Sequence, residues 1–175
     1  EILRGLGAEV IEAGRSESFV PIDTENIDQA QLGGMQSLID AAAVRHGPVD
    51  ALVSTDGDSD RPLIVGVDPV THRAQFFGGD LVGMIAAEYL AADAVVVPIS
   101  CNDAIDRGTL RDRLEPRTRI GSPFVIAGMQ AALARGRQAV CGWEANGGFL
   151  TGSTLERHGR RLAPLPTRDA VLPII

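Results

Sequence analysis

The sequence predicts an α/β protein made of two small lobes, each with a mixed sheet. Strand-like and helix-like stretches alternate along the chain, which is typical of α/β proteins rather than of helix bundles or sandwiches. Turn-forming residues cluster at 68–74, so we expect a first lobe at 1–74 and a second lobe at 75–175. The 175 residues suffice for one good core or two small ones.

The first lobe is expected to contain one long helix. Apolar residues recur at helical spacing over 26–45, and Gly47 and Pro48 end the pattern. A short helix is expected to open the chain. Strand-like runs lie at 8–13, 49–54, 63–67 and 74–77. The last two flank a turn-rich connection, which suits a hairpin.

The second lobe is predicted to begin with a helix, because Asp80 precedes a long apolar segment and is well placed to cap it. Two strands are expected at 94–99 and 138–142. Two further helices are expected at 123–135 and at 168–174, the second of them interrupted by Pro173.

Composition narrows the possible functions. A net charge of −7 and an isoelectric point near 4.9 disfavour binding to nucleic acid or to an anionic membrane. All 16 basic residues are arginines, which excludes a lysine Schiff base or a lysine phosphate clamp within the chain. No apolar run reaches the ~18 to 20 residues of a membrane span. The chain begins without Met or a signal pattern, so we expect it to start inside a longer protein.

The two cysteines do not indicate a metal site. Cys101 and Cys141 form no CxxC motif and have no histidine nearby in the sequence, which argues against zinc. We expect them to be reduced, buried thiols in a cytoplasmic protein.

The segment STDGDSDR, residues 54–61, places three aspartates at the end of a predicted strand. In an extended chain Asp56 and Asp60 would lie ~13 Å apart, at ~3.3 Å per residue, so the loop must curl if they act together with Asp58. Gly57 and Ser59 are small enough to permit that curl. Because crowded carboxylates repel one another, a divalent cation is expected among them, and the hard oxygen ligands favour Mg²⁺ or Ca²⁺.

Three other interpretations of this segment were weighed. An EF-hand is excluded, since its sixth position is Arg61 and its twelfth is Val67 instead of Gly and Glu. The aspartate nucleophile of haloacid-dehalogenase phosphatases needs a supporting lysine, which the chain lacks. Solvated Asx turns remain open, although an arginine beside the aspartates favours chemistry on phosphate.

A second motif, GWEANGG at 142–148, follows a strand-like run. Glu144 and Asn146 present a carboxylate and an amide on a glycine-framed loop, a pair suited to the neighbouring hydroxyls of a sugar. The alternative is an ordinary Asn-Gly turn with an exposed glutamate.

Together TDGDSDR, RTRIGSPFVIAGM at 117–129 and GWEANGGFL resemble the α-D-phosphohexomutase family, most closely its bacterial phosphomannomutase/phosphoglucomutase branch. The resemblance covers nearly the whole chain. It implies part of a four-domain isomerase that interconverts hexose 6-phosphate and hexose 1-phosphate, of mannose or glucose or both, through a phosphoserine and Mg²⁺. The chain would supply the end of the second domain and the third domain. The first domain, with the phosphoserine, and the fourth, with a phosphate-binding loop, would be its partners, so the chain alone is expected to be inactive.

The resemblance also assigns roles to residues. Asp56, Asp58 and Asp60 would bind Mg²⁺, and Arg61 would steady the transferring phosphoryl group as the catalytic residue. The resemblance further implies a substrate-binding set made up of Glu144, Asn146, Gly121 and Ser122.

Three positions depart from the family pattern. Ser122 stands where some members carry histidine near the reacting hydroxyl, and it cannot act as an imidazole acid or base. The segment 100–102, SCN, stands where others place a lysine, and Asn146 stands where serine is more common. Two rival functions therefore stay open: a metal-dependent carbohydrate-binding module, and a sugar phosphatase without mutase chemistry.

Overall fold

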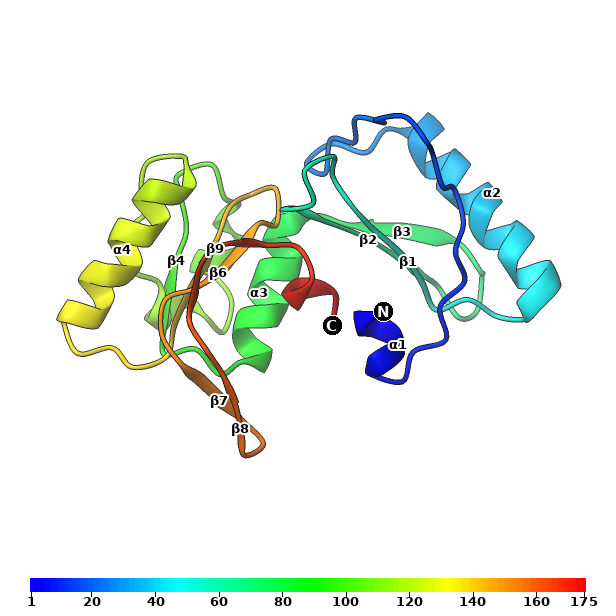
Figure 1. Ribbon diagram of the computed structural model, residues 1–175. Coiled ribbons are helices and arrows are strands. Elements are labelled where there is room, and N and C mark those ends of the chain that lie inside the picture. Colours follow the sequence, from blue (N-terminus) through cyan, green and yellow to red (C-terminus); the bar gives the residue numbers. More distant parts are fainter.

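Two lobes lie side by side in the computed structural model, which describes residues 1–175, and each lobe has its own sheet (Figure 1). The first sheet has the strand order β1-β2-β3, and the second has the order β4-β5-β6-β9. A separate two-stranded hairpin, β7-β8, projects from the second lobe. The predicted α/β class with two lobes is confirmed. No helix of the chain combines the length and the apolar character that crossing a membrane requires.

The first lobe packs helix α2, Gln29–His46, against an antiparallel meander. The strands are β1 Ala51–Thr55, β2 Pro62–Val67 and β3 Ala74–Phe77. Asp28 starts α2 with a capping box, because its carboxylate accepts from the Gln31 backbone while the Gln31 side chain accepts from the Asp28 backbone. The expected helix and the β2–β3 hairpin are confirmed, but this sheet is wholly antiparallel rather than mixed.

The strand expected at 8–13 is wrong. These residues follow the short helix α1, Ile2–Gly5, as irregular chain, and no strand of the meander pairs with them. Only Val10 and Ile11 are partly buried. An alternating apolar pattern alone does not make a strand: the edge strand β1 lies across a hollow from these residues, but no backbone pairing joins the two.

The second lobe is a three-layer α/β/α sandwich. Helix α3, Gly79–Tyr89, and helix α4, Ser122–Ala134, cover opposite faces of the sheet. Its strands are β4 Ala94–Val96, β5 Val140–Trp143, β6 Phe149–Thr151 and β9 Leu165–Asp169. β4 and β5 pair in parallel, and α4 lies in the crossover between them. Successive residues of β4 point to opposite faces of the sheet. Val95 packs in the core under α3, whereas Ala94 and Val96 pack in the core under α4.

Two predictions for the second lobe are wrong. The helix expected at 168–174 is the end of β9 followed by one 3₁₀ turn, η3, Leu172–Ile174. Asp80 does not cap α3: Gly78 holds that position, and the Asp80 carboxylate instead accepts the backbone N–H of Asn102 at 2.9 Å. The hairpin of β7, Leu155–Arg157, and β8, Arg160–Leu162, was not anticipated.

The lobes meet where β3 leads directly into α3. Since β3 pairs with β2 along its whole length, we propose that the division between the lobes follows Phe77 rather than residue 74. Two residues after Phe77, Gly79 lies against the loop at 145–147. A Cβ atom on Gly79 would be 2.1 Å from the backbone nitrogen of Gly147. Only glycine permits this approach.

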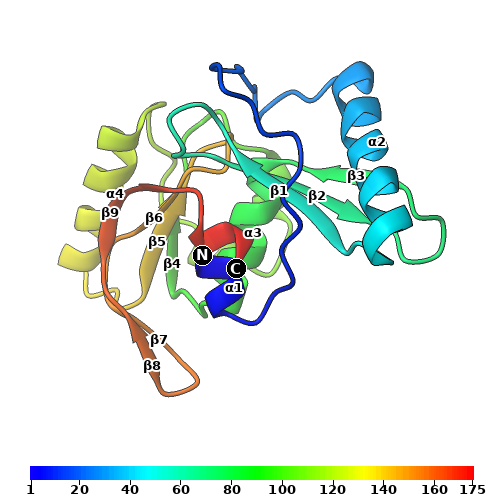
Figure 2. The ribbon, with the colours of Figure 1, turned by 45° about the vertical axis from the view of Figure 1, so that its right-hand side comes forward.

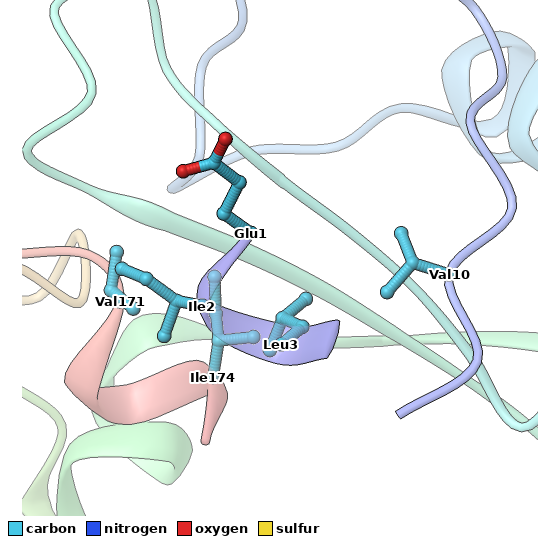
Figure 3. A pocket seen from close by; sticks show the side chains of 6 residues that line it. All are labelled: Glu1, Ile2, Leu3, Val10, Val171 and Ile174. Atoms are coloured by element: carbon cyan, nitrogen blue, oxygen red, sulfur yellow. The ribbon is translucent and has the colours of Figure 1, made fainter. Parts of the chain in front are cut away.

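The chain ends also lie close together, as both ribbon views show (Figures 1 and 2). Between α1 and η3 is an open hollow of about 470 Å³ (Figure 3). Five of its six lining residues are apolar, and Glu1 is the only charged one. The hollow therefore offers no set of polar groups for chemistry.

The close packing of α3 on the sheet yields a prediction about stability. Gly83 faces the buried indole of Trp143, and a Cβ atom there would lie 2.4 Å from the ring. We expect Gly83→Ala to lower the free energy of unfolding by about 1–3 kcal/mol through overpacking, measured by urea denaturation followed by circular dichroism. Gly108→Ala is the control, since its new methyl group would meet nothing closer than 3.5 Å. Equal stability of the two variants would contradict the packing described here.

Candidate functional site

Both candidate loops are hairpin turns. The aspartate loop, residues 56–61, joins β1 to β2. Residues 144–148 join β5 to β6 and are called the hexose loop after the role that the sequence analysis expects for them. Each loop lies at the end of its sheet that faces the other lobe. The lobes therefore bring the two predicted motifs together.

The aspartate loop curls as its spacing predicts. Asp56 is buried, and its Oδ1 accepts the backbone N–H groups of Asp60 and Arg61, both at 3.1 Å. One carboxylate oxygen from each of Asp56, Asp58 and Asp60 lies within 4.8 Å of the others. The loop thus gathers three oxygen ligands around one point.

The two small residues of this loop have different roles. Ser59, not Gly57, takes the left-handed conformation that closes the turn, with φ of 60°. Gly57 lies against the ring of Phe19: a Cβ atom there would be 1.9 Å from this exposed ring, which would have to move aside. The segment before α2 therefore covers part of the aspartate loop.

The charges of the aspartates are only partly balanced within the chain. Nε of Arg61 lies 3.5 Å from Asp56 and 3.6 Å from Asp60, yet it makes no hydrogen bond. Asp60 Oδ1 is also buried without a hydrogen-bond partner. Burial raises the pKa of Asp60 above its usual value; Arg168 and Arg61 lower this pKa, while Asp58 and Asp56 raise it. A buried carboxylate oxygen without a donor, in an all-oxygen set, fits a hard divalent cation.

The start of α4 contacts the hexose loop through a hydrogen bond. Glu144 is buried, and its Oε2 accepts a hydrogen bond from the Ser122 hydroxyl at 3.0 Å. Ser122 is the first residue of α4, and Gly121 before it has φ of 119°. The structure thus places Gly121 and Ser122 beside Glu144. Oε1 of Glu144 makes no hydrogen bond in the chain, so it is free to accept from a hydroxyl group.

Asn146 is buried at the centre of the same loop. Its Oδ1 accepts the backbone N–H of Gly148 at 3.0 Å, while its backbone carbonyl accepts from the Thr24 hydroxyl of the first lobe at 3.2 Å. The amide Nδ2 makes no hydrogen bond in the chain and can donate to a ligand. The open alternative of an exposed Glu in a plain Asn-Gly turn is wrong, because both side chains are buried.

Arg168 is a site residue that the sequence analysis missed. At the end of β9 its guanidinium forms ion pairs with Asp60 of the aspartate loop and, at 3.6 Å, with Glu144 of the hexose loop. The sequence pattern predicts a helix at 168–174, which would not place Arg168 beside the loops. The pairing of Phe149 with Asp169 instead places the end of β9 beside the hexose loop.

The segment 100–102 has a structural role. The Asn102 side chain accepts from the backbone of Ala104 at the start of a 3₁₀ turn, and Arg117 donates to the Cys101 carbonyl at 2.8 Å. Cys101 and Cys141 are both buried and unpaired, as predicted. Burial raises the pKa of both thiols well above the usual range, so they stay protonated.

The chain is similar to known proteins in sequence and in fold. The sequence profile described as "Phosphoglucomutase/phosphomannomutase, alpha/beta/alpha domain III" matches residues 78–175. A protein of Sinorhizobium fredii named phosphomannomutase is 45% identical over 174 residues, and one of Salmonella muenchen with the same name is 42% identical. Each alignment covers 99% of this chain and 34% of the relative.

Solved structures share the fold. A phosphoglucomutase/phosphomannomutase family protein of Burkholderia thailandensis aligns with a TM-score of 0.53 and 18% identity, over 82% of this chain and 28% of that one. An N-acetylphosphoglucosamine mutase of Aspergillus fumigatus aligns with a TM-score of 0.51 and 18% identity, over 71% of this chain and 29% of that one. The chain spans about a third of the length of its curated relatives, and it belongs to the phosphoglucomutase/phosphomannomutase family.

Proposed function

We propose that the chain supplies the cation-binding loop and the hexose-binding loop of a phosphohexomutase. The enzyme would interconvert hexose 6-phosphate and hexose 1-phosphate, of mannose or glucose or both, through a phosphoserine outside these residues. One observation carries the proposal: Arg168 pairs with a carboxylate of each loop, so a site for a cation and a site for sugar hydroxyls adjoin. The remaining domains of the enzyme would be its partners.

The aspartate loop would hold Mg²⁺ through Asp56, Asp58 and Asp60, whose oxygens already lie within 4.8 Å of one another. When bound, the cation neutralises and orients a phosphoryl group. Arg61 balances the carboxylates from the protein side, and its guanidinium would steady the same phosphoryl group. This role for Arg61 rests on its position beside the cluster.

The hexose loop would bind hydroxyl groups through Glu144 Oε1 and Asn146 Nδ2. An acceptor next to a donor matches two neighbouring hydroxyls of a pyranose. Such a pair can hold the ring in either of two orientations, so that C1 or C6 faces the phosphoserine. Ser122 would orient the Glu144 carboxylate through its hydrogen bond, which is a positioning role rather than that of an acid or base.

A mutase is favoured over the two rival functions. The curated relatives carry the name of a mutase, whereas a carbohydrate-binding module or a sugar phosphatase finds no such counterpart among them. We also propose a cytoplasmic location, which suits two cysteines that form no disulfide.

The first prediction tests the cation site. Asp58 is exposed and forms no hydrogen bond or ion pair, so Asp58→Asn is expected to leave the fold intact while removing one charged ligand. We expect the Mg²⁺ affinity, measured by isothermal titration calorimetry, to fall by about tenfold or more. Asp112→Asn, a change at another exposed carboxylate, should bind Mg²⁺ as the unchanged chain does. An unaltered titration of Asp58→Asn would rule out this ligand assignment.

The second prediction tests the hexose loop in the enzyme that carries this chain. Glu144→Gln removes a charged acceptor, so kcat/KM for mannose 1-phosphate should fall about 10- to 100-fold, from the ~1.5–3 kcal/mol of a charged hydrogen bond. Glu156→Gln is the control, because that glutamate pairs with Arg161 on the exposed β7-β8 hairpin. Release of free phosphate without hexose 6-phosphate would favour the phosphatase, and equal activity of both variants would refute the role of Glu144.

A further inference from the structure

We propose that Arg168 is a positioning residue that couples cation binding at the aspartate loop to the arrangement of the hexose loop. The proposal rests on the proposed function, since it concerns the same two loops. It gives Arg168 a role that neither motif contains. The argument uses its ion pairs, the path of its side chain and the oxygens of Asp60.

Arg168 reaches both loops from a fixed base. It lies in β9, which is paired with β6 next to the hexose loop. Its aliphatic stem runs over Gly148: a Cβ atom on Gly148 would be 2.7 Å from Cδ and 3.0 Å from Cγ of Arg168. The side chain is about three-quarters buried. A planar guanidinium on a stem packed this way can hold two carboxylates in one relative orientation.

The two oxygens of Asp60 are used differently. Oδ2 forms the ion pair with Arg168, whereas Oδ1 is buried without a hydrogen-bond partner. A metal-binding carboxylate commonly has its second oxygen held by a neighbouring group, which fixes the direction of the first. Arg168 is such a group for Asp60. Oδ1 has only the longer ion pair with Arg61 Nε, at 3.6 Å, and no hydrogen bond, so it is the oxygen available to the cation.

The same guanidinium meets Glu144 from the other side. Glu144 Oε2 lies 3.6 Å from Arg168 and also accepts from Ser122, so its direction is set by two partners. A cation bound to Asp60 weakens the attraction between Asp60 and the guanidinium of Arg168. The attraction between that guanidinium and Glu144 changes as a result. Cation binding and the hexose loop are thus linked, and such a coupling acts equally in both directions.

Other contacts between the lobes lack this property. The Thr24 hydroxyl contacts only the backbone of the hexose loop, and Pro62 packs against Gly147. Neither touches a proposed cation ligand through a side-chain group. Arg168 is the residue through which a charge at one loop reaches a carboxylate of the other.

The test follows backbone amide signals of the ¹⁵N-labelled chain during titration with MgCl₂. In the unchanged chain, Mg²⁺ should shift Gly57 in the aspartate loop and also Gly147 and Gly148 in the hexose loop. In Arg168→Gln the shift at Gly57 should persist and the shifts at Gly147 and Gly148 should be lost. The Mg²⁺ affinity alone does not test the coupling, because removing the positive charge of Arg168 also strengthens the attraction of the aspartates for Mg²⁺.

Two further variants sharpen the result. Arg168→Lys keeps the charge but offers a single ammonium instead of a fork, so it should also lose the shifts at Gly147 and Gly148. Arg161→Gln, which breaks only an exposed pair with Glu156, should behave like the unchanged chain. If Mg²⁺ still shifts Gly147 and Gly148 in Arg168→Gln or in Arg168→Lys, the proposal is overturned.

The outcomes also separate this proposal from the proposed function. If Mg²⁺ shifts only the aspartate loop of the unchanged chain, the coupling is overturned and the cation site stands. If Mg²⁺ shifts neither loop, the coupling and the Mg²⁺ site both fail.

Discussion

The close contact between two backbones, at Gly79 and Gly147, is the constraint that holds the start of the second lobe against the hexose loop. A single added carbon at residue 79 would overlap the Gly147 nitrogen, so the start of α3 can lie against the hexose loop only while both positions lack side chains. β3 ends two residues earlier, and two residues of the first lobe, Pro62 and Thr24, also contact the hexose loop. The aspartate loop and the hexose loop are neighbours as a result.

The arrangement of side chains at the aspartate loop follows from the need to balance its negative charges. Three carboxylates in a half-buried loop need cations, and the chain supplies one arginine from each lobe, Arg61 and Arg168. Neither gives Asp60 Oδ1 a hydrogen bond, so a divalent ion completes the set in our proposal. The acidic net charge is then no obstacle to a phosphorylated substrate, since the local balance at the loop matters more than the total. The hexose itself is uncharged where Glu144 and Asn146 would bind it.

Local patterns in the sequence were enough for α1 to α4, for the three strands of the first lobe and for the curl of the aspartate loop, although they also predicted a helix at 168–174 that does not form. The curl follows from distance once the aspartates are taken to share an ion, because extended aspartates lie too far apart to do so. Arg168 could not be placed, since its role depends on β9 pairing with β6 across an intervening hairpin, which no local pattern encodes. The strand at 8–13 failed although its pattern is suitable and the edge strand β1 lies nearby, because no backbone pairing joins the two. Asp80 likewise has the residue type of a helix cap but bonds to Asn102 instead.

The position of Trp143 has a practical consequence. It is the only tryptophan of the chain, it is buried at the end of β5, and its indole N–H has no hydrogen-bond partner. The next residue is Glu144, and the indole stacks on Phe149, the first residue after the hexose loop. The loop is therefore bracketed by the only indole fluorophore and its stacking partner. We therefore expect the emission of this protein to report the state of residues 144–148 without any attached dye.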